Sequence, residues 1–595
     1  MAPQNLIYKT RLDQFLSLYN QQRQRFNIMS TIRIVLLVVF LLSLYLMIKN
    51  DGAVQWIIIA IFSSIAFFIL INKHMKLAQK MRMHRALADI NENEHNYLSS
   101  TSIPFDDGNE HILTKHPYTY DLDIFGDHSL FHRLNRTATY IGSKKLAHFL
   151  SHRLSNEEIF SQQDAIKEIS SKIEWRQEML AVAMTSDDSQ KTYNTLIDWT
   201  KTEVKQHSSL MKIISYLLPI MTVLFLVAYA WIGGDIPRLS FAFLFLINLG
   251  ILGKHFRQIK DEILGESQIN KSIQKYSRLM YMLESHSFQS TKLQQLQKRL
   301  LTDNETASHH IANLSRLFQQ MDSVHNPMGA IIFNGMSLYH VHTLRKLQEW
   351  KATFAPMISD WLEVIGEIEA INSLSNFAYN NPAYTYPNLN SQEQITFSNL
   401  GHPMLPDNVR VCNDVTFKDQ KFIILTGSNM SGKSTFLRSL GINMVLANAG
   451  APVCATAANI HPLDIYVSMR LSDSLSDNES YFFAEVKRLK EVMDAADSKL
   501  TFILLDEILR GTNSDDKRQG TVEVIKKLIS KRVIGVIATH DLKVCDTTSD
   551  YPTQLINKNF EVEIREGELL FDYKLRDGAC KNKSATYIMK KMKII

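Results

Sequence analysis

Residues 423–435 read IILTGSNMSGKST, and this stretch decides the fold of the C-terminal part of the chain. The apolar run Phe422–Leu425 is typical of a buried strand, and the pattern G-x-x-x-x-G-K-S follows from Gly427 to Ser434. Glycines let the backbone turn sharply so that N–H groups converge on an anion, and the positive end of the next helix faces the same point. The spacing predicts a phosphate-binding loop. A glycine-containing strand–helix turn without a nucleotide is the alternative, and the flanking patterns disfavour it.

The side chains of this loop have separate expected roles. Lys433 is expected to reach the β- and γ-phosphates, and the Ser434 hydroxyl is expected to bind Mg²⁺. ATP and Mg²⁺ are therefore the expected ligands. The residues expected to contact the nucleotide are Gly427, Ser428, Asn429, Met430, Ser431, Gly432, Lys433, Ser434 and Thr435.

Two later apolar runs also end in polar residues. Residues 500–505 lead into Asp506 and Glu507, which we expect to hold Mg²⁺ and to polarise the attacking water, respectively. Val533–Thr539 leads into His540, a candidate for contact with the γ-phosphate, although a lone histidine is more often structural. The carboxyl ends of parallel strands share one sheet edge, where ligands bind. The sequence thus predicts an α/β P-loop NTPase head, with a parallel sheet flanked by helices, whose catalytic residues are Lys433, Glu507 and His540.

At this point the sequence resembles the ATPase domain of the MutS mismatch-repair family. The matching stretches are Asn413–Val415, Thr426–Thr435, Ala449–Val453, Ser480–Glu485, Leu505–Glu507, Arg510–Thr512 and Ala538–His540. The resemblance implies a homodimer of facing heads, in which Ser480 of one head completes the ATP site of the other in trans. Two positions depart from the family pattern: Ser428 replaces a usual proline, and Leu509 replaces a usual glycine.

Four stretches of the chain contain no charged residue. They are Ile34–Ile48, Ala53–Ile71, Ile213–Ile232 and Leu239–Gly253. They are uniformly apolar rather than striped, which favours two transmembrane helical hairpins over hairpins buried in a protein core. The first and fourth stretches are shorter than the ~20 residues of a full span, and flanking Arg33, Arg238 and Lys254 would extend them by snorkelling.

Basic residues predict the orientation of these hairpins. Lysines and arginines flank their outer ends, as in Arg23–Arg33, Lys73–Arg85 and Lys201–Lys212, whereas the two short connecting loops carry almost none. Positive flanks stay on the cytoplasmic side. We therefore expect a multi-pass protein of the inner, or cytoplasmic, membrane that is anchored in the lipid bilayer by four transmembrane helices, with the ATPase part and both termini in the cytoplasm.

The helical regions complete the expected organisation. Leu122–Arg153 resembles a passage of the MutS core domain, and Lys254–Ser375 is polar and helical like the family's lever helices, although a generic helical hairpin also fits it. The tail Lys581–Lys593 fits either a helix packed on a partner head or a solvated end. The expected domains are 1–30 (cytoplasmic segment), 31–72 (hairpin 1), 73–212 (core-like, all-α), 213–253 (hairpin 2), 254–390 (lever) and 391–595 (ATPase domain with tail).

Two functions remain open at this stage. The first is a membrane-anchored MutS-like ATPase whose dimer closes on duplex DNA, related by resemblance to mismatch repair. The second is a membrane mechanochemical ATPase that moves a protein or lipid partner without DNA. The net charge of +5 neither requires nor excludes nucleic acid, and no basic cluster interleaved with aromatics suggests a base-stacking platform. The residues around the first hairpin offer no Phe-x-Glu mismatch-reading element.

Cysteine usage agrees with a reducing compartment. The chain has four cysteines, Cys412, Cys454, Cys545 and Cys580, and their spacing does not match a metal site. All four lie in the part expected to face cytosolic ATP. We expect reduced thiols, mostly buried.

Overall fold

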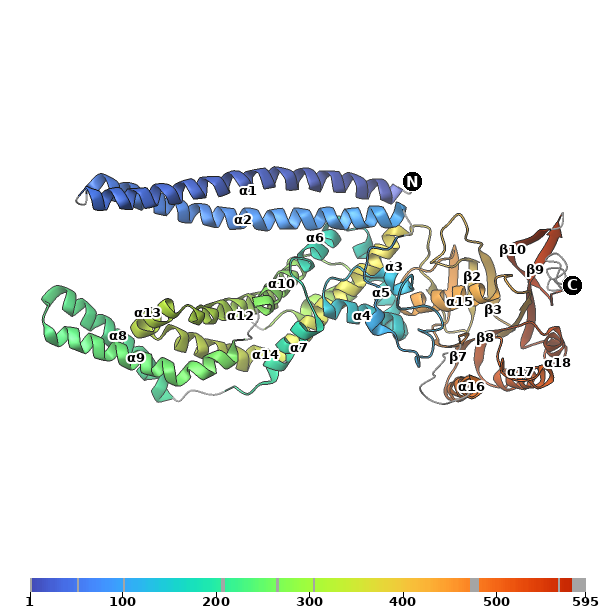
Figure 1. Ribbon diagram of the computed structural model, residues 1–595. Coiled ribbons are helices and arrows are strands. Elements are labelled where there is room, and N and C mark those ends of the chain that lie inside the picture. The colour runs from blue at the N-terminus through green and yellow to red at the C-terminus, as the bar shows by residue number, and fades with distance from the viewer. Residues whose placement is uncertain are drawn as a thin grey trace.

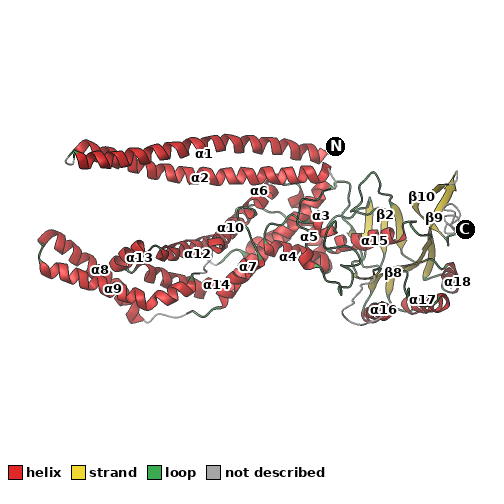
Figure 2. Ribbon diagram, viewed as in Figure 1, coloured by secondary structure: helices red, strands yellow, loops and turns green. Residues whose placement is uncertain are grey.

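The computed structural model describes residues 3–50, 53–99, 102–204, 209–263, 267–302, 305–470, 481–565 and 568–580. Helices form one end of the molecule, and two sheets with their covering helices form the other, which holds the C-terminus (Figures 1 and 2). The long helix α14 (Tyr339–Asn380) runs between the two ends. This arrangement separates the apolar hairpins from the phosphate-binding loop.

The first apolar hairpin consists of α1 (Pro3–Lys49) and α2 (Val54–Ser99). Its tip points away from the sheets, and the N-terminus lies at its opposite end (Figure 1). The expected boundaries at residues 30/31 and 72/73 fall inside these helices, so the polar segments at 3–30 and 73–99 continue the apolar ones without a break. A helix satisfies its backbone hydrogen bonds internally, so it needs no break where the solvent changes.

The second apolar hairpin consists of α8 (Ser209–Ile232) and α9 (Asp235–Glu262). Its tip points to the same end of the molecule as the first (Figure 1). Large apolar side chains are exposed along both hairpins, including Phe62 at 76% and Trp231 at 90%. In the described part of the chain, α1, α2, α8 and α9 are long and apolar enough to cross a membrane. The expected boundaries at 212/213 and 253/254 again fall inside helices.

The body between hairpins and sheets is helical and packs around α14. The α14 residues Ile358, Trp361 and Ile365 are buried in the main apolar core. The predicted helical character of 254–375 is confirmed by several helices, whereas their role as lever helices stays a prediction. The elements of this region are η1 (Asn109–His111), α3 (Leu130–Leu134), α4 (Tyr140–Ser151), α5 (Asn156–Ser170), α6 (Ile173–Ala183), α7 (Gln190–Lys201), α10 (Ser267–Glu284), α11 (Thr291–Arg299), α12 (Ala307–Asp322), η2 (Ser323–His325) and α13 (Pro327–Ser337).

The larger sheet has the strand order β10-β9-β4-β8-β7-β6. All neighbours from β9 to β6 are parallel, and β10 pairs with β9 antiparallel. The predicted parallel sheet is thus present, with one antiparallel edge strand. The strands are β4 (Phe422–Gly427), β6 (Asp464–Ser468), β7 (Thr501–Asp506), β8 (Val533–Thr539), β9 (Leu555–Arg565) and β10 (Glu568–Asp577).

A smaller sheet and several helices complete this end of the molecule. The small sheet has the order β1-β5-β2-β3, and its central β2 pairs antiparallel with both neighbours. Its strands are β1 (Asn388–Leu389), β2 (Ile395–Leu400), β3 (Asn413–Phe417) and β5 (Ala457–Ile460). The helices are α15 (Lys433–Asn448), α16 (Tyr481–Ser498), α17 (Ser514–Ile529), η3 (Leu542–Asp546) and α18 (Thr547–Asp550).

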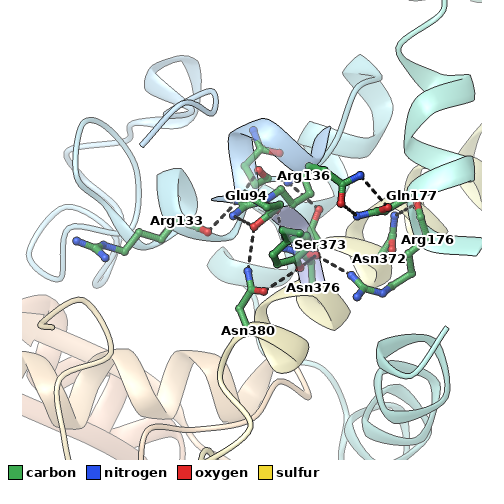
Figure 3. Close-up of polar contacts among 12 residues, drawn as sticks. Glu94, Arg133, Arg136, Arg176, Gln177, Asn372, Ser373, Asn376 and Asn380 are labelled. Atoms are coloured by element: carbon green, nitrogen blue, oxygen red, sulfur yellow. Dashed lines mark hydrogen bonds and ion pairs between the residues drawn. The ribbon is translucent and has the colours of Figure 1, made fainter. Parts of the chain in front are cut away.

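A buried polar network joins the first hairpin to the end of α14 (Figure 3). Glu94 of α2 forms an ion pair with Arg136, and its carboxylate also accepts hydrogen bonds from the Asn376 and Asn380 amides at 2.8 and 3.0 Å. Arg176 of α6 donates to Asn376 at 2.7 Å. Both members of the Glu94–Arg136 pair are buried, so the charges are compensated by each other and by these amides.

Candidate active site

The phosphate-binding loop begins where β4 ends. All six residues of β4 are buried, because the strand lies inside the sheet between β8 and β9. A side chain at Gly427 would place its Cβ 2.6 Å from the Ser431 hydroxyl and 2.8 Å from the Phe560 carbonyl oxygen, so the tight turn requires glycine there. Gly432 has φ 104° and precedes α15, whose N-terminus receives no side-chain cap. An uncapped helix N-terminus behind a tight loop suits an anion.

Lys433 lies folded across this loop. Its ammonium donates to the carbonyl oxygens of Gly427 at 3.0 Å and Ser428 at 2.9 Å. The residue is only 6% exposed, and burial lowers the pKa of Lys433 while the Glu507 and Asp506 carboxylates act in the opposite direction. The cation is therefore fixed at the loop, within reach of any phosphate bound there.

Ser434 and Asp506 come together from different elements. The Ser434 hydroxyl, in the first turn of α15, donates to the Asp506 carboxylate at the end of β7 at 2.6 Å. Hydroxyl and carboxylate oxygens are hard ligands of the kind that Mg²⁺ prefers. In the same loop, the buried Ser428 and Ser431 hydroxyls have no hydrogen-bond partner among the described residues. The donor set therefore fits a magnesium nucleotide.

Glu507 and His540 form a second pair at the same edge. The His540 Nε2 atom pairs with the Glu507 carboxylate. His540 Nδ1 lies 2.9 Å from the Gly427 carbonyl oxygen and 3.5 Å from the Lys433 ammonium. Two acceptor oxygens, one from Glu507 and one from Gly427, thus face the ring of His540. The hydrogen bond from His540 lowers the pKa of Glu507 to about 2, against the effect of its partial burial, so this carboxylate is ionised at neutral pH.

A cavity of about 550 Å³ opens beside the loop. On one side it is lined by the loop from Asn429 to Thr435 and by Glu507. The rest of the lining is largely apolar and comes from β2, the segment between β2 and β3, and β9 and β10, including Leu405, Phe560 and Tyr573. His402 also lines it, and burial lowers the pKa of His402 to about 4, helped by nearby arginines, so its ring is neutral at pH 7. The cavity combines a polar phosphate side with an apolar side.

The profile of MutS domain V matches residues 423–594. Proteins named DNA mismatch repair protein MutS are similar to the same part of the chain. The protein from Methanococcoides burtonii is 31% identical over 227 residues, which are 36% of this chain and 25% of the relative. The protein from Thermotoga neapolitana is 31% identical over 222 residues, which are 36% of this chain and 28% of the relative.

The C-terminal part of the chain carries a domain of the MutS type. The match covers about a quarter of each of these two relatives and lies in the part of this chain that carries the sheets. The resemblance seen in the motifs is thereby confirmed. Mixed α/β structure with the domain V match agrees with the predicted fold class at this end of the molecule.

The structure brings most of the predicted site residues together at one edge of the MutS domain. Lys433, Ser434, Asp506, Glu507 and His540 lie within one chain of contacts. Their individual roles remain predictions. Gly427 and Ser428 form the base of the loop, whereas Asn429, Met430 and Thr435 are exposed at the cavity. Ser480 and the tail 581–593 lie outside the described residues.

Two residues without a role in the sequence analysis hold the turn after β7. Glu485 of α16 is 4% exposed and accepts hydrogen bonds from the backbone N–H groups of Leu509 at 2.6 Å and Arg510 at 3.0 Å. Arg510 donates to the Glu507 and Asp506 carbonyl oxygens, each at 2.9 Å. These contacts fix the backbone that carries both acids. The signal in the sequence was a single acid, Glu485, within the otherwise apolar run 481–486.

The two departures from the MutS pattern have different consequences. Ser428 is part of the loop backbone that binds Lys433, and its hydroxyl does not participate in that contact. Leu509 adopts φ 62°, a left-handed conformation that explains why glycine is usual at this position. The expectation of mostly buried thiols agrees with the structure: Cys454, Cys545 and Cys580 are buried, and Cys412 is half-buried.

Proposed function

We propose that this chain is a membrane-anchored, Mg²⁺-dependent ATPase of the MutS type that works as a homodimer. The observation that carries the proposal is the convergence of Lys433, Ser434, Asp506, Glu507 and His540 at the carboxyl ends of β4, β7 and β8. Ligands bind at this edge of open α/β sheets. The four apolar helices that point away from this edge support anchoring in a bilayer.

The chemistry follows from where each group lies. The loop backbone and Lys433 bind the β- and γ-phosphates, with the lysine moving from the loop carbonyls onto phosphate oxygen. Ser434 and Asp506 would hold Mg²⁺, which would supply positive charge beside the phosphates. Ionised Glu507 orients the attacking water and accepts its proton, while His540 holds the carboxylate in place. Ser480 of the partner subunit completes the site in trans, so hydrolysis requires two facing heads.

Closure of the heads would be transmitted by rigid contacts to the helical body. The Asp121 carboxylate of the body accepts hydrogen bonds from the backbone N–H groups of Met469 and Arg470, just after β6, both at 2.8 Å. Leu122 packs against Gly441 of α15, where an added Cβ would lie 2.6 Å away. From this body α14 extends to the second hairpin. A movement of the head therefore moves α14 and the hairpins with it.

Duplex DNA is the first candidate for what the closing dimer grips. The relatives named DNA mismatch repair protein support it. A second candidate, a mechanochemical ATPase that acts on a membrane protein or lipid without DNA, is favoured by one observation. The distal end of α14 contacts the apolar hairpin, as in the bond of His342 to the Ser215 carbonyl oxygen at 3.0 Å and the ion pair of Glu349 with Lys212.

The ATPase rate of the full-length protein, with and without duplex DNA at low and physiological salt, separates the two candidates. Stimulation by DNA that disappears in the double variant Lys298→Glu/Arg316→Glu, at exposed positions on α11 and α12, supports DNA binding. An unchanged rate at low salt contradicts it and leaves the membrane candidate. For the shared site, Ser480→Arg should hydrolyse ATP poorly alone and regain activity in mixed dimers. No recovery in mixed dimers contradicts a site completed in trans.

A further inference from the structure

The helix α13 differs from the rest of the region expected to be polar. From Asn326 to Leu344 the sequence contains no Asp, Glu, Lys or Arg. Four large apolar side chains of α13 are exposed: Met328 at 76%, Ile331 at 49%, Ile332 at 53% and Phe333 at 55%. Exposed apolar side chains gathered on one short helix are unfavourable in water unless another surface covers them.

The one amide side chain of α13, Asn334, points inward instead. Asn334 is fully buried, and its amide donates to the Ala330 carbonyl oxygen and contacts His340, which is also fully buried, at 2.7 Å each. The His340 backbone N–H in turn donates to the Asn334 side chain at 3.0 Å. Together these bonds close the turn between α13 and α14. The helix thus buries its amide and exposes four large apolar side chains, unlike a typical helix on the surface of a water-soluble protein.

The inward side of α13 packs on the second apolar hairpin. The Asn248 amide of α9 donates to the Gly335 carbonyl oxygen at 2.8 Å and to the Thr222 hydroxyl of α8 at 3.1 Å, and both side chains are fully buried. Gly335 lies directly against Phe245, since an added Cβ would be 2.2 Å from that ring. Small residues and buried neutral polar side chains are the usual contacts between helices within a bilayer. We call α8, α9 and α13 the distal helical unit.

The depth of this contact follows from helix geometry. Asn248 lies roughly 20 Å along α9 from its start at Asp235, at 1.5 Å per residue. In a hydrocarbon core of about 30 Å that begins near Asp235, this depth lies past the middle, in the half nearer the ATPase domain. α12 leads toward α13 from the side of the sheets, and α14 leads from α13 back toward the sheets (Figure 1). Large apolar side chains of α8 and α9 are exposed as well, including Leu224 at 62% and Leu246 at 64%.

We propose that α13 is a re-entrant helix, inserted from the side of the ATPase domain into one half of the bilayer, with Met328, Ile331, Ile332 and Phe333 in contact with lipid acyl chains. This inference rests on the proposed membrane anchoring by α8 and α9. The inserted α13 would attach the N-terminal end of α14 directly to the membrane, because α13 leads into α14 through the Asn334–His340 turn.

Collision accessibility of spin labels tests the proposal in the full-length protein reconstituted into phosphatidylcholine–phosphatidylglycerol liposomes. Labels are attached to single cysteines at Met328 and Ile332, after replacement of the four native cysteines. Leu224 on α8 and Ile58 on α2 report the bilayer, and exposed Arg316 on α12 reports water. Oxygen is concentrated in lipid, so we expect labels at 328 and 332 to collide more often with oxygen than with a water-soluble nickel chelate. The label at 224 should show the same preference, and the label at 316 should show the reverse.

Each other outcome overturns a defined statement. Labels at 328 and 332 that behave like 316, while 224 and 58 behave as lipid-exposed, contradict the re-entrant helix and leave the anchoring intact. Water-like behaviour at 224 and 58 contradicts the anchoring itself. Protection at 328 and 332 from both reagents means that protein, such as a second copy, covers α13, and contradicts lipid contact.

A second measurement applies if the cysteine-free protein does not fold. A benzophenone amino acid introduced at Ile332 in the native-cysteine background should crosslink to lipid on illumination, and the same group at Arg316 should not. Equal lipid labelling at the two positions, or crosslinks only to protein at 332, contradicts the proposal.

Discussion

The sheet domain and the distal helical unit differ in which residue types they bury and which they expose. In the sheet domain every residue of β4, β7 and β8 is buried, and the polar side chains gather at the ends of these strands. In the distal helical unit the polar side chains Thr222, Asn248 and Asn334 are buried, and many large apolar side chains are exposed. One chain therefore follows two solvation rules, and α14 joins the two regions. Charged side chains are absent from 213–232, 239–253 and 327–337 of the distal helical unit, whereas the sheet domain places them at its strand ends.

The largest effect is expected from replacing the Glu507 carboxylate, a change confined to the sheet domain. Glu507→Gln keeps the shape of the side chain but removes the base that accepts a proton from water. We expect a decrease in kcat of about 10²–10⁴-fold, with ATP still bound and retention in liposomes unchanged. Single-turnover hydrolysis and nucleotide filter binding measure this, with exposed Glu523→Gln on α17 as the control. Turnover at the native rate would mean that another residue positions the water.

The same carboxylate gives a pH dependence with a defined sign. The pKa of Glu507 falls from 4.5 to about 2 in the folded protein because His540 donates to it. A depressed pKa stabilises the fold above the ordinary value and loses that contribution as pH falls toward the folded value. Between pH 4.5 and 2 the native protein should therefore lose more stability than Glu507→Gln does. Parallel acid-unfolding curves for the two proteins contradict the pairing with His540.

The next largest effect is expected at the junction between the two regions. Glu94→Gln leaves Arg136 buried without its counter-charge, and breaking a buried pair in this way costs about 3–5 kcal/mol. Denaturant unfolding of the solubilised protein should show this loss of stability. Glu92→Gln, exposed on the same helix two residues away, is the matched control. Equal midpoints for the two variants would show that the network in Figure 3 contributes no net stability.

A smaller effect is expected inside the distal helical unit. Asn248→Leu removes the hydrogen bonds to Thr222 and Gly335, and polar contacts between helices in a bilayer contribute about 1–2 kcal/mol. We expect lower thermal stability of the helical part with the ATPase rate of the sheet domain retained. Leu246→Ile, on the exposed side of α9, should leave both unchanged. If Asn248→Leu stabilises the protein, the buried amide is not a packing contact.

Sequence reasoning succeeded where a local pattern carries the physics. The apolar strands, the loop glycines and the four uncharged runs are each contiguous in sequence. The structure confirms the strands, the tight loop and the helical conformation of the four runs. It did not find α13, because an 11-residue helix is shorter than a membrane span and the long polar region around it masks its lack of charge. It also missed the Glu94–Asn376 contact, whose partners are 282 residues apart and become neighbours only when α2 packs on α14.

The turn after β7 shows both the reach of the resemblance and its limit. The motif comparison singled out Leu509 as a departure, and only the backbone angle of 62° shows what the departure means. A left-handed conformation costs a residue with a Cβ about 1–2 kcal/mol. The strain persists because the Leu509 and Arg510 N–H groups are held by buried Glu485.

The smallest predicted effect separates this backbone strain from side-chain packing. Leu509→Ala removes the contacts of the side chain and keeps the strain, whereas Leu509→Gly removes both. Leu509→Gly should therefore be more stable than Leu509→Ala by about 1 kcal/mol, which denaturant unfolding of the two variants measures directly. Glycine and alanine of equal stability would mean that Leu509 is unstrained in solution. In that case the bonds from Glu485 would not hold the turn that carries Asp506 and Glu507 in its left-handed form.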